Sequence, residues 1–514
     1  MMTPTEISAN PEARSAPLLR LADLIDRRPG LVLPVWIFAY FAVLWRAAHR
    51  PLWYDELFTY YTSTAPTFAR FFGSVLFDVN PPLSFLFVRA SITLFGDSPF
   101  AIRLPSMLAF LAASLLVYVL VKRRLGGGLG LATLGILWSF SLTAYAAEAR
   151  PYGLLLGLFS IAMLCWLHAI EAARWTKWHT GLAAAIGAML LTHCFSPVFV
   201  AAIGAGELAR TIAAKRIDKR VWAALLAPLP LLLLYIPLVR NAQAPLHPHA
   251  FDASLSTIPL FYMRIFAPVL PAIGVILMLS LIRSGREAAV RMRDLARSHE
   301  IAFCLAAFVL PTVIVGYCIW SGIPFFDRYG IGATISGSLM LTVLLATLTR
   351  RNVDASVTAA VLILILFCLM KPGIHAVMER NENVSRSYLT VDPELPFVAA
   401  CGLTFLEMDH RESPEFAKRL YYLMDRESSL AYVHSTYFEM YPIMQRWFPI
   451  RANVSPYREF VKSHRRFLVL TAHDCPLDWL LLKLKDDGAQ IRFLQNLQTG
   501  YYDRELYEVT LPGE

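Results

Sequence analysis

Charged residues are scarce in this chain. Only 17% of its 514 residues are Asp, Glu, Lys or Arg, whereas 56% are hydrophobic. The mean hydropathy is +0.50. Soluble globular domains carry about 25% charged residues. The composition therefore excludes an ordinary soluble domain and predicts a polytopic membrane protein.

Several other signals are missing as well. The 7 cysteines show neither zinc-ligand spacing nor a disulfide framework. No glycine-rich phosphate loop follows a predicted strand, which disfavours a nucleotide site. The net charge of +9 comes from short basic clusters between apolar runs. Such clusters orient membrane segments, so no nucleic-acid partner is expected.

Apolar runs of the length that a bilayer requires, about 17 to 25 residues, follow a polar start that has no cleavage site. Basic clusters fall in every second connection, where the positive-inside rule places cytoplasmic loops. We therefore predict about eleven transmembrane helices, a cytoplasmic amino terminus and an extracytoplasmic carboxyl terminus. The expected spans are 31–49, 101–121, 129–147, 152–170, 180–193, 197–213, 221–239, 265–283, 301–320, 332–349 and 356–371.

Three domains follow from this pattern: a cytoplasmic segment over 1–30, an all-α membrane domain over 31–371, and an extracytoplasmic α/β domain over 372–514. In the first outer loop, the apolar segment Leu83–Phe95 is short for a span and is predicted to be an interfacial helix. A transmembrane alternative would invert every later loop. The strand candidates in the tail are Phe397–Cys401, Leu430–His434, Phe467–Thr471, Gln490–Leu497 and Leu506–Leu511.

Two adjacent carboxylates, Asp55 and Glu56, follow the first span. Ionisable groups at membrane level usually pair, line a polar cavity or do chemistry, so this pair is the main active-site candidate. One carboxylate could accept a proton while its neighbour holds a cation or orients the acceptor. The alternative is a solvated pair that caps a helix start.

Two further groups are expected on the same side of the membrane. Glu148, Arg150 and Tyr152 lie in a tight turn, where the guanidinium suits phosphate oxygens. A structural ion pair is the competing interpretation of this turn. Arg328 and Tyr329 precede a late span, and Arg328 is either a second phosphate ligand or a snorkelling side chain.

Taken in order, these motifs resemble glycosyltransferase family 39, a group of GT-C enzymes that includes protein O-mannosyltransferases and the lipid A aminoarabinose transferase. The resemblance covers roughly residues 30 to 350. It is carried by Trp53-Tyr54-Asp55-Glu56, Asn80-Pro81-Pro82-Leu83, Phe95-Gly96-Asp97, Arg103-Leu104-Pro105, Glu148-Ala149-Arg150-Pro151-Tyr152 and Arg328-Tyr329.

The resemblance implies a bacterial, inner-membrane enzyme with a membrane domain of GT-C type. Such an enzyme transfers a sugar from a polyprenyl-phosphate carrier to a lipid, glycan or protein acceptor at the outer face, with inversion. Asp55 would be the base, and Glu56 and Glu148 would be further catalytic acidic residues. The substrate-binding residues would be Arg150, Arg328, Tyr54, Asn80, Tyr152 and Tyr329.

Chemistry agrees with this assignment, because a departing phosphate gains negative charge and an attacking acceptor loses a proton. The sequence leaves open whether Glu56 and Glu148 bind a divalent metal, and no other cofactor is expected. The alternative function is a transporter or flippase of lipid-linked sugars. Transporters usually show internal repeats and broken helices at mid-bilayer, whereas here the ionisable residues cluster at one face.

Overall fold

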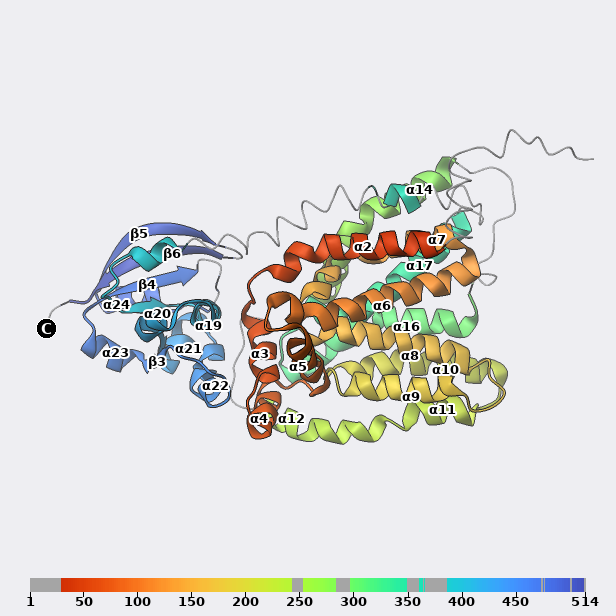
Figure 1. The fold of residues 1–514 in the computed structure, drawn as a ribbon, viewed down its shortest axis with the longest axis horizontal. Coiled ribbons are helices and arrows are strands. Elements are labelled where there is room, and N and C mark those ends of the chain that lie inside the picture. Colours follow the sequence, from red (N-terminus) through yellow and green to blue (C-terminus); the bar gives the residue numbers. More distant parts are fainter. Residues whose placement is uncertain are drawn as a thin grey trace, which may run out of the picture.

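The computed structural model describes residues 29–242, 253–282, 296–348, 360–363, 365, 386–472, 475, 477–499 and 502–512. Most of the expected cytoplasmic segment 1–30, the expected domain boundary at 371 and most of the expected span 356–371 lie outside these residues. The described residues form a long helical bundle and an α/β domain that lies at one end of it (Figure 1).

The bundle contains a helix at every expected span that falls on described residues. In the described part, 6 helices are long and apolar enough to cross a membrane, or 7 with one bent pair, so the expected count of eleven is not confirmed. The helices are α2 (Pro29–His49), α6 (Pro99–Leu125), α7 (Gly127–Ser139), α8 (Pro151–Ala169), α9 (Lys177–Leu190), α10 (Ser196–Ala214), α11 (Lys219–Leu226), α12 (Tyr235–Ala242), α13 (Thr257–Phe266), α14 (Leu270–Ile282), α16 (Ser298–Ser321) and α17 (Gly332–Leu348).

Several expected spans are interrupted. The span expected at 129–147 bends by 83° between α7 and the 3-10 helix η2 (Ser141–Ala147). The span expected at 221–239 consists of α11, η3 (Leu229–Leu234) and α12, because this stretch contains prolines that remove helical hydrogen bonds. The remaining 3-10 helices of the bundle are η5 (Ala267–Val269) and η6 (Asp327–Gly330).

Helices α6 and α8 pack at very close range. A Cβ atom added to Gly153 would lie 2.2 Å from Ser106 Oγ, and one added to Gly157 would lie 2.7 Å from the Ala109 carbonyl oxygen. Small residues spaced by four let membrane helices approach closely. The contact joins the N-terminal halves of both helices, so Arg103 on α6 and the turn before α8 meet at the same end of the bundle.

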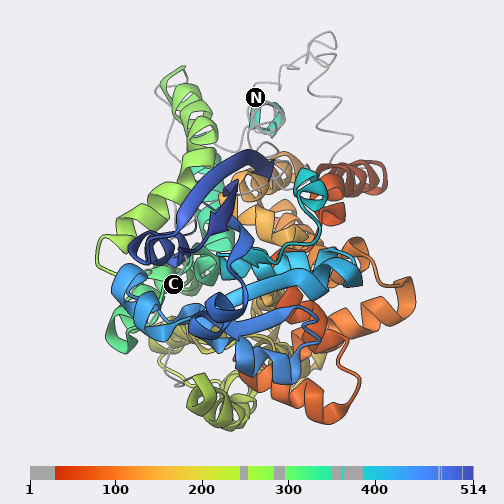
Figure 2. The same cartoon turned by 90° about the vertical axis from the view of Figure 1, so that its left-hand side faces the viewer.

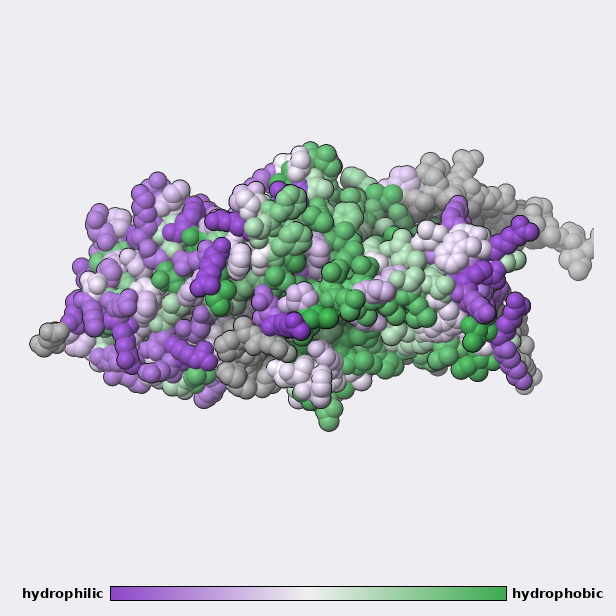
Figure 3. Space-filling model, turned by 90° about the horizontal axis from the view of Figure 1, so that it is seen from below, coloured by the Kyte–Doolittle hydropathy of each residue, from purple (hydrophilic) through white to green (hydrophobic). Residues whose placement is uncertain are grey.

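Three shorter helices cover that end: α3 (Tyr54–Ser63), α4 (Phe68–Asp78) and α5 (Leu83–Phe95). The helix predicted over Leu83–Phe95 is confirmed with these bounds, while its interfacial position stays a prediction. Figure 3 shows a predominantly apolar surface over the middle of the molecule and hydrophilic residues concentrated at both ends. This distribution matches a bundle whose central band contacts hydrocarbon.

The C-terminal domain is built on a 6-stranded sheet with the order β3-β2-β1-β4-β6-β5. Strands β3, β2, β1 and β4 are parallel, and β6 is antiparallel to β4 and β5. Figure 2 shows this domain lying across the end of the bundle. The strands are β1 (Phe397–Ala399), β2 (Leu420–Met424), β3 (Asn453–Pro456), β4 (Arg466–Ala472), β5 (Gln490–Thr499) and β6 (Tyr502–Thr510).

Helices flank the sheet and cover two apolar cores. Along β4, Leu468 and Leu470 face one core, whereas Phe467 and Val469 face the other, because side chains alternate along a strand. The helices are α19 (Gly402–Arg411), α20 (Pro414–Arg419), α21 (Arg426–Val433), α22 (Tyr441–Trp447), α23 (Tyr457–Ser463) and α24 (Leu480–Asp486), with 3-10 helices η7 (Ser387–Thr390) and η8 (Tyr437–Met440).

Two predictions about the C-terminal domain are wrong in detail. The segment Leu430–His434 is not a strand, because Asp425 caps helix α21 by accepting hydrogen bonds from the Glu427 and Ser428 amides. Strands β2 and β3 were not predicted. The expected lack of a disulfide is also wrong, since Cys401 and Cys475 are bonded and their Cα atoms are 6.3 Å apart.

The disulfide joins the residues that follow β1 and β4, which are neighbours in the sheet. It links positions separated by 74 residues. We expect Cys401→Ala to lower the free energy of unfolding of the C-terminal domain by about 2–4 kcal/mol, because a long loop is no longer closed in the unfolded state. Thermal unfolding followed by tryptophan fluorescence measures this change.

Cys304→Ala, at a free cysteine in α16, serves as the control and leaves that transition in place. In the denatured wild-type protein, a thiol reagent should label Cys401 and Cys475 only after reduction. Labelling of both without a reductant would contradict the assignment.

Candidate functional site

Asp55 and Glu56 occupy the first turn of α3, where the positive end of the helix dipole favours carboxylates. Their side chains reach different partners. Asp55 Oδ2 lies 2.9 Å from Nη2 of Arg328, and these two side chains are 16% and 13% exposed. Arg328 comes from η6, just before α17. A carboxylate and a guanidinium that are far apart in the sequence therefore form an ion pair that is largely shielded from solvent.

Arg150 forms a second ion pair beside the first. Its Nη1 lies 3.2 Å from Asp78 Oδ2 and donates a hydrogen bond of 3.0 Å to the main-chain carbonyl of Asp55. Asn80 Nδ2 donates to Asp78 Oδ1 at 3.1 Å. Burial raises the pKa of Asp78, and the charge of Arg150 opposes this shift. The predicted residue Arg150 thus contacts Asp55 directly, and Asn80 is linked to Arg150 through Asp78.

Glu56 is fully buried and is held by Arg103 of α6. Arg103 Nε donates to Glu56 Oε1 at 2.7 Å, and Arg103 Nη2 donates to Oε2 at 2.5 Å. The Ala149 amide adds a bond of 2.8 Å to Oε1, and the Trp53 amide a long one of 3.4 Å to Oε2. Glu56 therefore joins α3 to α6 and to the turn before α8.

Glu148 lies in that turn and faces Arg50. Its Oε1 is 3.5 Å from Arg50 Nη2, whereas Oε2 is buried and has no hydrogen-bond partner among the described residues. Burial raises the pKa of Glu148 to about 7, while the charge of Arg50 opposes the shift. Glu148 is thus a carboxyl group whose protonation changes near neutral pH.

Aromatic rings form one wall of the site. The Arg328 guanidinium carbon lies 5.8 Å from the centre of the Tyr152 ring, within cation–π range. The Tyr329 ring is 4.7 Å from Phe195 and 6.1 Å from His193. Burial lowers the pKa of His193 to about 3, as expected for a packed neutral histidine. The Tyr152 ring therefore supports Arg328, and Tyr329 packs beside Tyr152.

The structure brings the predicted residues Asp55, Glu56, Glu148, Arg150 and Arg328 into one cluster of ion pairs. Asn80 and Tyr152 contact this cluster, Tyr329 packs beside Tyr152, and Tyr54 directly precedes Asp55 in α3. Sequence reasoning did not include Arg50, Asp78 or Arg103 among the site residues, although Arg103 stands in a quoted motif. Their signal was charge near a helix end, which Asp97 shares without joining the cluster.

Some polar atoms in the cluster lack partners. Glu148 Oε2, Arg150 Nε and Arg328 Nε are buried and make no hydrogen bond to any described residue. Buried polar atoms are normally satisfied, so their grouping around Asp55 indicates a place for a polar ligand or ordered water. Two guanidinium groups with spare donors suit an anionic group such as a phosphate.

The predicted metal ligands Glu56 and Glu148 do not form a suitable donor set. Both oxygens of Glu56 accept hydrogen bonds, and Glu148 lies against the positive charge of Arg50. Among the residues that the structure describes, no three His, Cys, Asp or Glu side chains are grouped as metal ligands. The geometry at Glu56 and Glu148 therefore favours their roles as partners of arginines.

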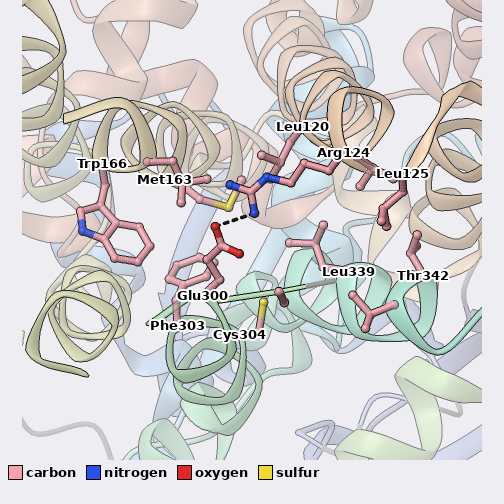
Figure 4. A pocket seen from close by; sticks show the side chains of 14 residues that line it. Leu120, Arg124, Leu125, Met163, Trp166, Glu300, Phe303, Cys304, Leu339 and Thr342 are labelled. Atoms are coloured by element: carbon pink, nitrogen blue, oxygen red, sulfur yellow. Dashed lines mark ion pairs between the residues drawn. The ribbon is translucent and has the colours of Figure 1, made fainter. Parts of the chain in front are cut away.

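A separate pocket lies among α6, α8, α16 and α17. Its lining is mostly apolar and contains Arg124 and Glu300, which form an ion pair of 2.5 Å (Figure 4). Arg124 and Arg103 stand near opposite ends of α6, roughly 30 Å apart at the helical rise. No predicted site residue lines this cavity, so it is distinct from the Asp55 cluster.

Comparisons with known proteins agree with this architecture. A family model described as dolichyl-phosphate-mannose-protein mannosyltransferase matches residues 79–239. The chain is similar to the crystal structure of ArnT from Cupriavidus metallidurans in the apo state, with a TM-score of 0.56 and 14% identity over 93% of this chain and 97% of that chain. No curated protein matches the sequence.

The same relative has also been solved bound to undecaprenyl phosphate. Its TM-score to this chain is 0.55, with 15% identity over 94% of this chain and 98% of that chain. Both likenesses show that the chain has the fold of ArnT over almost its whole length. The predicted arrangement of a mostly helical membrane domain and a smaller C-terminal domain with a sheet is thereby confirmed.

Replacing Arg103 tests the clamp on Glu56. We expect Arg103→Met to destabilise the protein by about 3–5 kcal/mol, because it leaves a buried carboxylate without its partner. Arg103→Lys should not restore stability, since an ammonium lacks the planar fork. Thermal melting and monodispersity in detergent measure the effect. Arg123→Met, at an exposed position of the same helix, is the control, and an equal loss there would argue against the clamp.

The raised pKa of Glu148 predicts a pH effect on stability. Between its ordinary value of 4.5 and about 7, the folded protein holds a proton that the unfolded chain releases. The contribution of Glu148 to stability therefore falls as pH rises through this window and is constant above it. Glu148→Gln should remove this decline. Melting curves of both proteins at about pH 5 and about pH 8 test this, and equal pH slopes would contradict it.

Proposed function

We propose that this protein is an integral-membrane glycosyltransferase that moves a sugar from a polyprenyl-phosphate carrier to an acceptor at the extracytoplasmic face. The observation that carries the proposal is the contact between Asp55 and Arg328, with Arg150 bonded to the Asp55 carbonyl. A candidate base and two candidate phosphate ligands thus share one buried cluster. The ArnT fold supports the proposal, because that relative binds undecaprenyl phosphate.

Each of the charged side chains Arg328, Arg150 and Asp55 has a role in the proposed reaction. Arg328 and Arg150 bind the carrier phosphate through charge-assisted hydrogen bonds. When Arg328 turns to the phosphate, Asp55 loses its cationic partner and becomes a stronger base. Asp55 then accepts the proton of an acceptor hydroxyl or amine as that atom bonds to the anomeric carbon. The bond from this carbon to the phosphate oxygen breaks on the opposite face, so polyprenyl phosphate leaves and the configuration inverts.

The neighbouring residues position these groups. Glu56, held by Arg103, sets the direction of the first turn of α3 and thereby of Asp55. Asn80 donates a hydrogen bond to Asp78, and Asp78 forms an ion pair with Arg150. The Tyr152 ring supports the Arg328 guanidinium, and Tyr329 packs beside Tyr152. Glu148 is the second acidic group and, with its spare oxygen, is placed to accept a hydrogen bond from the substrate.

The proposed location is a bacterial inner membrane, with the amino terminus in the cytoplasm and the C-terminal domain in the periplasm. The Cys401–Cys475 disulfide supports this orientation, because disulfides persist in oxidising compartments. The acceptor is a lipid, a glycan or a protein that reaches the membrane surface. The carrier can keep its isoprenoid tail in the bilayer while its phosphate reaches the arginines.

Replacing Asp55 tests the proposal. We expect Asp55→Asn to reduce sugar transfer by about 10²–10⁴-fold, because the amide cannot accept the acceptor proton. The measurement is transfer of radiolabel from polyprenyl-phosphate sugar to membrane acceptors by reconstituted protein. Asp97→Asn, at an exposed carboxylate of the same outer region, should keep the wild-type rate.

Undiminished transfer by folded Asp55→Asn protein would rule out Asp55 as the base. A flippase would instead move the labelled lipid across the vesicle membrane without transferring its sugar. A wild-type protein that only translocates the lipid would overturn the transferase proposal.

A further inference from the structure

The C-terminal domain packs directly against α3, the helix that carries the candidate base. The ring centres of Tyr54 and Phe438 are 6.1 Å apart, and those of Phe58 and Phe448 are 5.2 Å apart. All four rings belong to one apolar cluster that contains residues of α3 and of the C-terminal domain. Part of α3 is therefore buried by the C-terminal domain rather than by the membrane bundle.

Two polar contacts show that helix α19 of this domain lies alongside α3. The Tyr54 amide donates to Glu407 Oε1 at 3.2 Å, and the Tyr61 hydroxyl lies 3.3 Å from His410 Nδ1. Tyr54 and Tyr61 are about two turns apart on α3, and Glu407 and His410 are about one turn apart on α19. The domain therefore contacts α3 at its first turn and again towards its end.

The first turn of α3 takes a partner from outside the helix. The first amides of a helix have no acceptor within it, and a Ser, Thr, Asp or Asn at the preceding position usually supplies one. Here that position is Trp53, whose indole N–H can donate but not accept. The Glu407 carboxylate accepts from the Tyr54 amide instead. Its negative charge also suits the positive end of the helix dipole.

The sheet of the C-terminal domain orients Glu407. Arg504 Nη2 donates to Glu407 Oε2 at 3.2 Å, and the Arg504 side chain is 5% exposed. Arg504 lies in β6, where it pairs with Ala472 of β4 on one side and Leu497 of β5 on the other. Groups carried by strands are held more precisely than groups on loops. The sheet therefore fixes Arg504, which orients Glu407 towards the amide of the residue before Asp55.

The position of this amide matters for the proposed reaction. Asp55 directly follows Tyr54, so the direction of its carboxylate depends on where the first turn of α3 lies. That carboxylate has to reach the acceptor proton when Arg328 turns from Asp55 to the phosphate. A displacement of about 1 Å in such a group costs about 10²-fold in rate.

We propose that Glu407, oriented by Arg504, is a positioning residue of the transfer reaction. By capping α3 from the C-terminal domain, it fixes the direction in which Asp55 points. The inference rests on the proposed function and gives the C-terminal domain a part in the chemical step. Glu407 acts through the main chain of α3 and does not contact the reacting atoms.

Shortening Glu407 tests the inference while its charge is kept. Glu407→Asp retains a carboxylate for Arg504 but is shorter by one methylene, so it cannot reach both Arg504 and the Tyr54 amide. We expect kcat to fall about tenfold or more, because Asp55 is displaced. KM for the donor should not change, since the arginines that bind the phosphate are untouched. Rates are measured on full-length reconstituted protein with radiolabelled undecaprenyl-phosphate mannose and aminoarabinose as donors.

A double-mutant cycle tests whether Arg504 acts through Glu407. Residues that act through one contact have non-additive effects. We expect Arg504→Met to lower kcat in the wild-type protein and to lower it no further in Glu407→Ala. The double variant leaves neither charge of this pair without its partner, so it should fold even where a single variant does not. Its kcat should still lie about tenfold or more below that of the wild type.

Glu427→Asp is the matched control, because Glu427 pairs with Arg458 on the surface of the same domain and its side chain is 83% exposed. It should keep the wild-type kcat. Unchanged kcat in Glu407→Asp and in the double variant, a loss confined to KM, or additive losses in the cycle would overturn the inference while the transferase proposal stands. A wild-type protein that transfers sugar from neither donor would overturn the proposed function and the inference together.

Discussion

The buried pair between Glu56 and Arg103 is the interaction on which the site depends. Both side chains have no exposed surface. Burying two charges is costly unless the geometry is good and the remaining donors are satisfied. Here all three guanidinium nitrogens donate: Nε and Nη2 bond to Glu56, Nη2 also bonds to the Pro51 carbonyl, and Nη1 bonds to the carbonyls of Ala48 and Arg50. The pair therefore fixes the end of α2, the start of α3 and α6 relative to one another.

The two adjacent carboxylates have opposite environments, because neighbouring residues on a helix point about 100° apart. Glu56 points to the interior, and both of its carboxylate oxygens accept hydrogen bonds. Asp55 points to the partly exposed side, where its partner Arg328 retains a spare donor atom. A satisfied group suits a structural role, and an incompletely satisfied cluster suits a ligand. This difference separates the positioning residue from the proposed base within one sequence motif.

The C-terminal domain also helps to fix the position of the first turn of α3. The amide of Tyr54 is held from the domain side by Glu407, and the side chain of Glu56 is held from the membrane side by Arg103. The short segment Tyr54–Glu56 is thus anchored on both sides of Asp55. An enzyme that must hold a lipid-linked donor and a separate acceptor needs such anchoring, since misplacement of a base by about 1 Å costs about 10²-fold in rate.

The sequence by itself determined the class of the molecule and the candidate residues for its site. Hydropathy and composition are local properties, so the membrane helices, the helix Leu83–Phe95 and the change to an α/β tail could be predicted. Only the tertiary structure decided which residues of the chain pair with one another. Glu56 pairs with Arg103 across 47 residues, Asp55 pairs with Arg328, and Cys401 bonds to Cys475. Strands β2 and β3 and the exact lengths of the spans also escaped prediction. Burial and partner choice depend on which elements pack together, and no local pattern of residues contains that information.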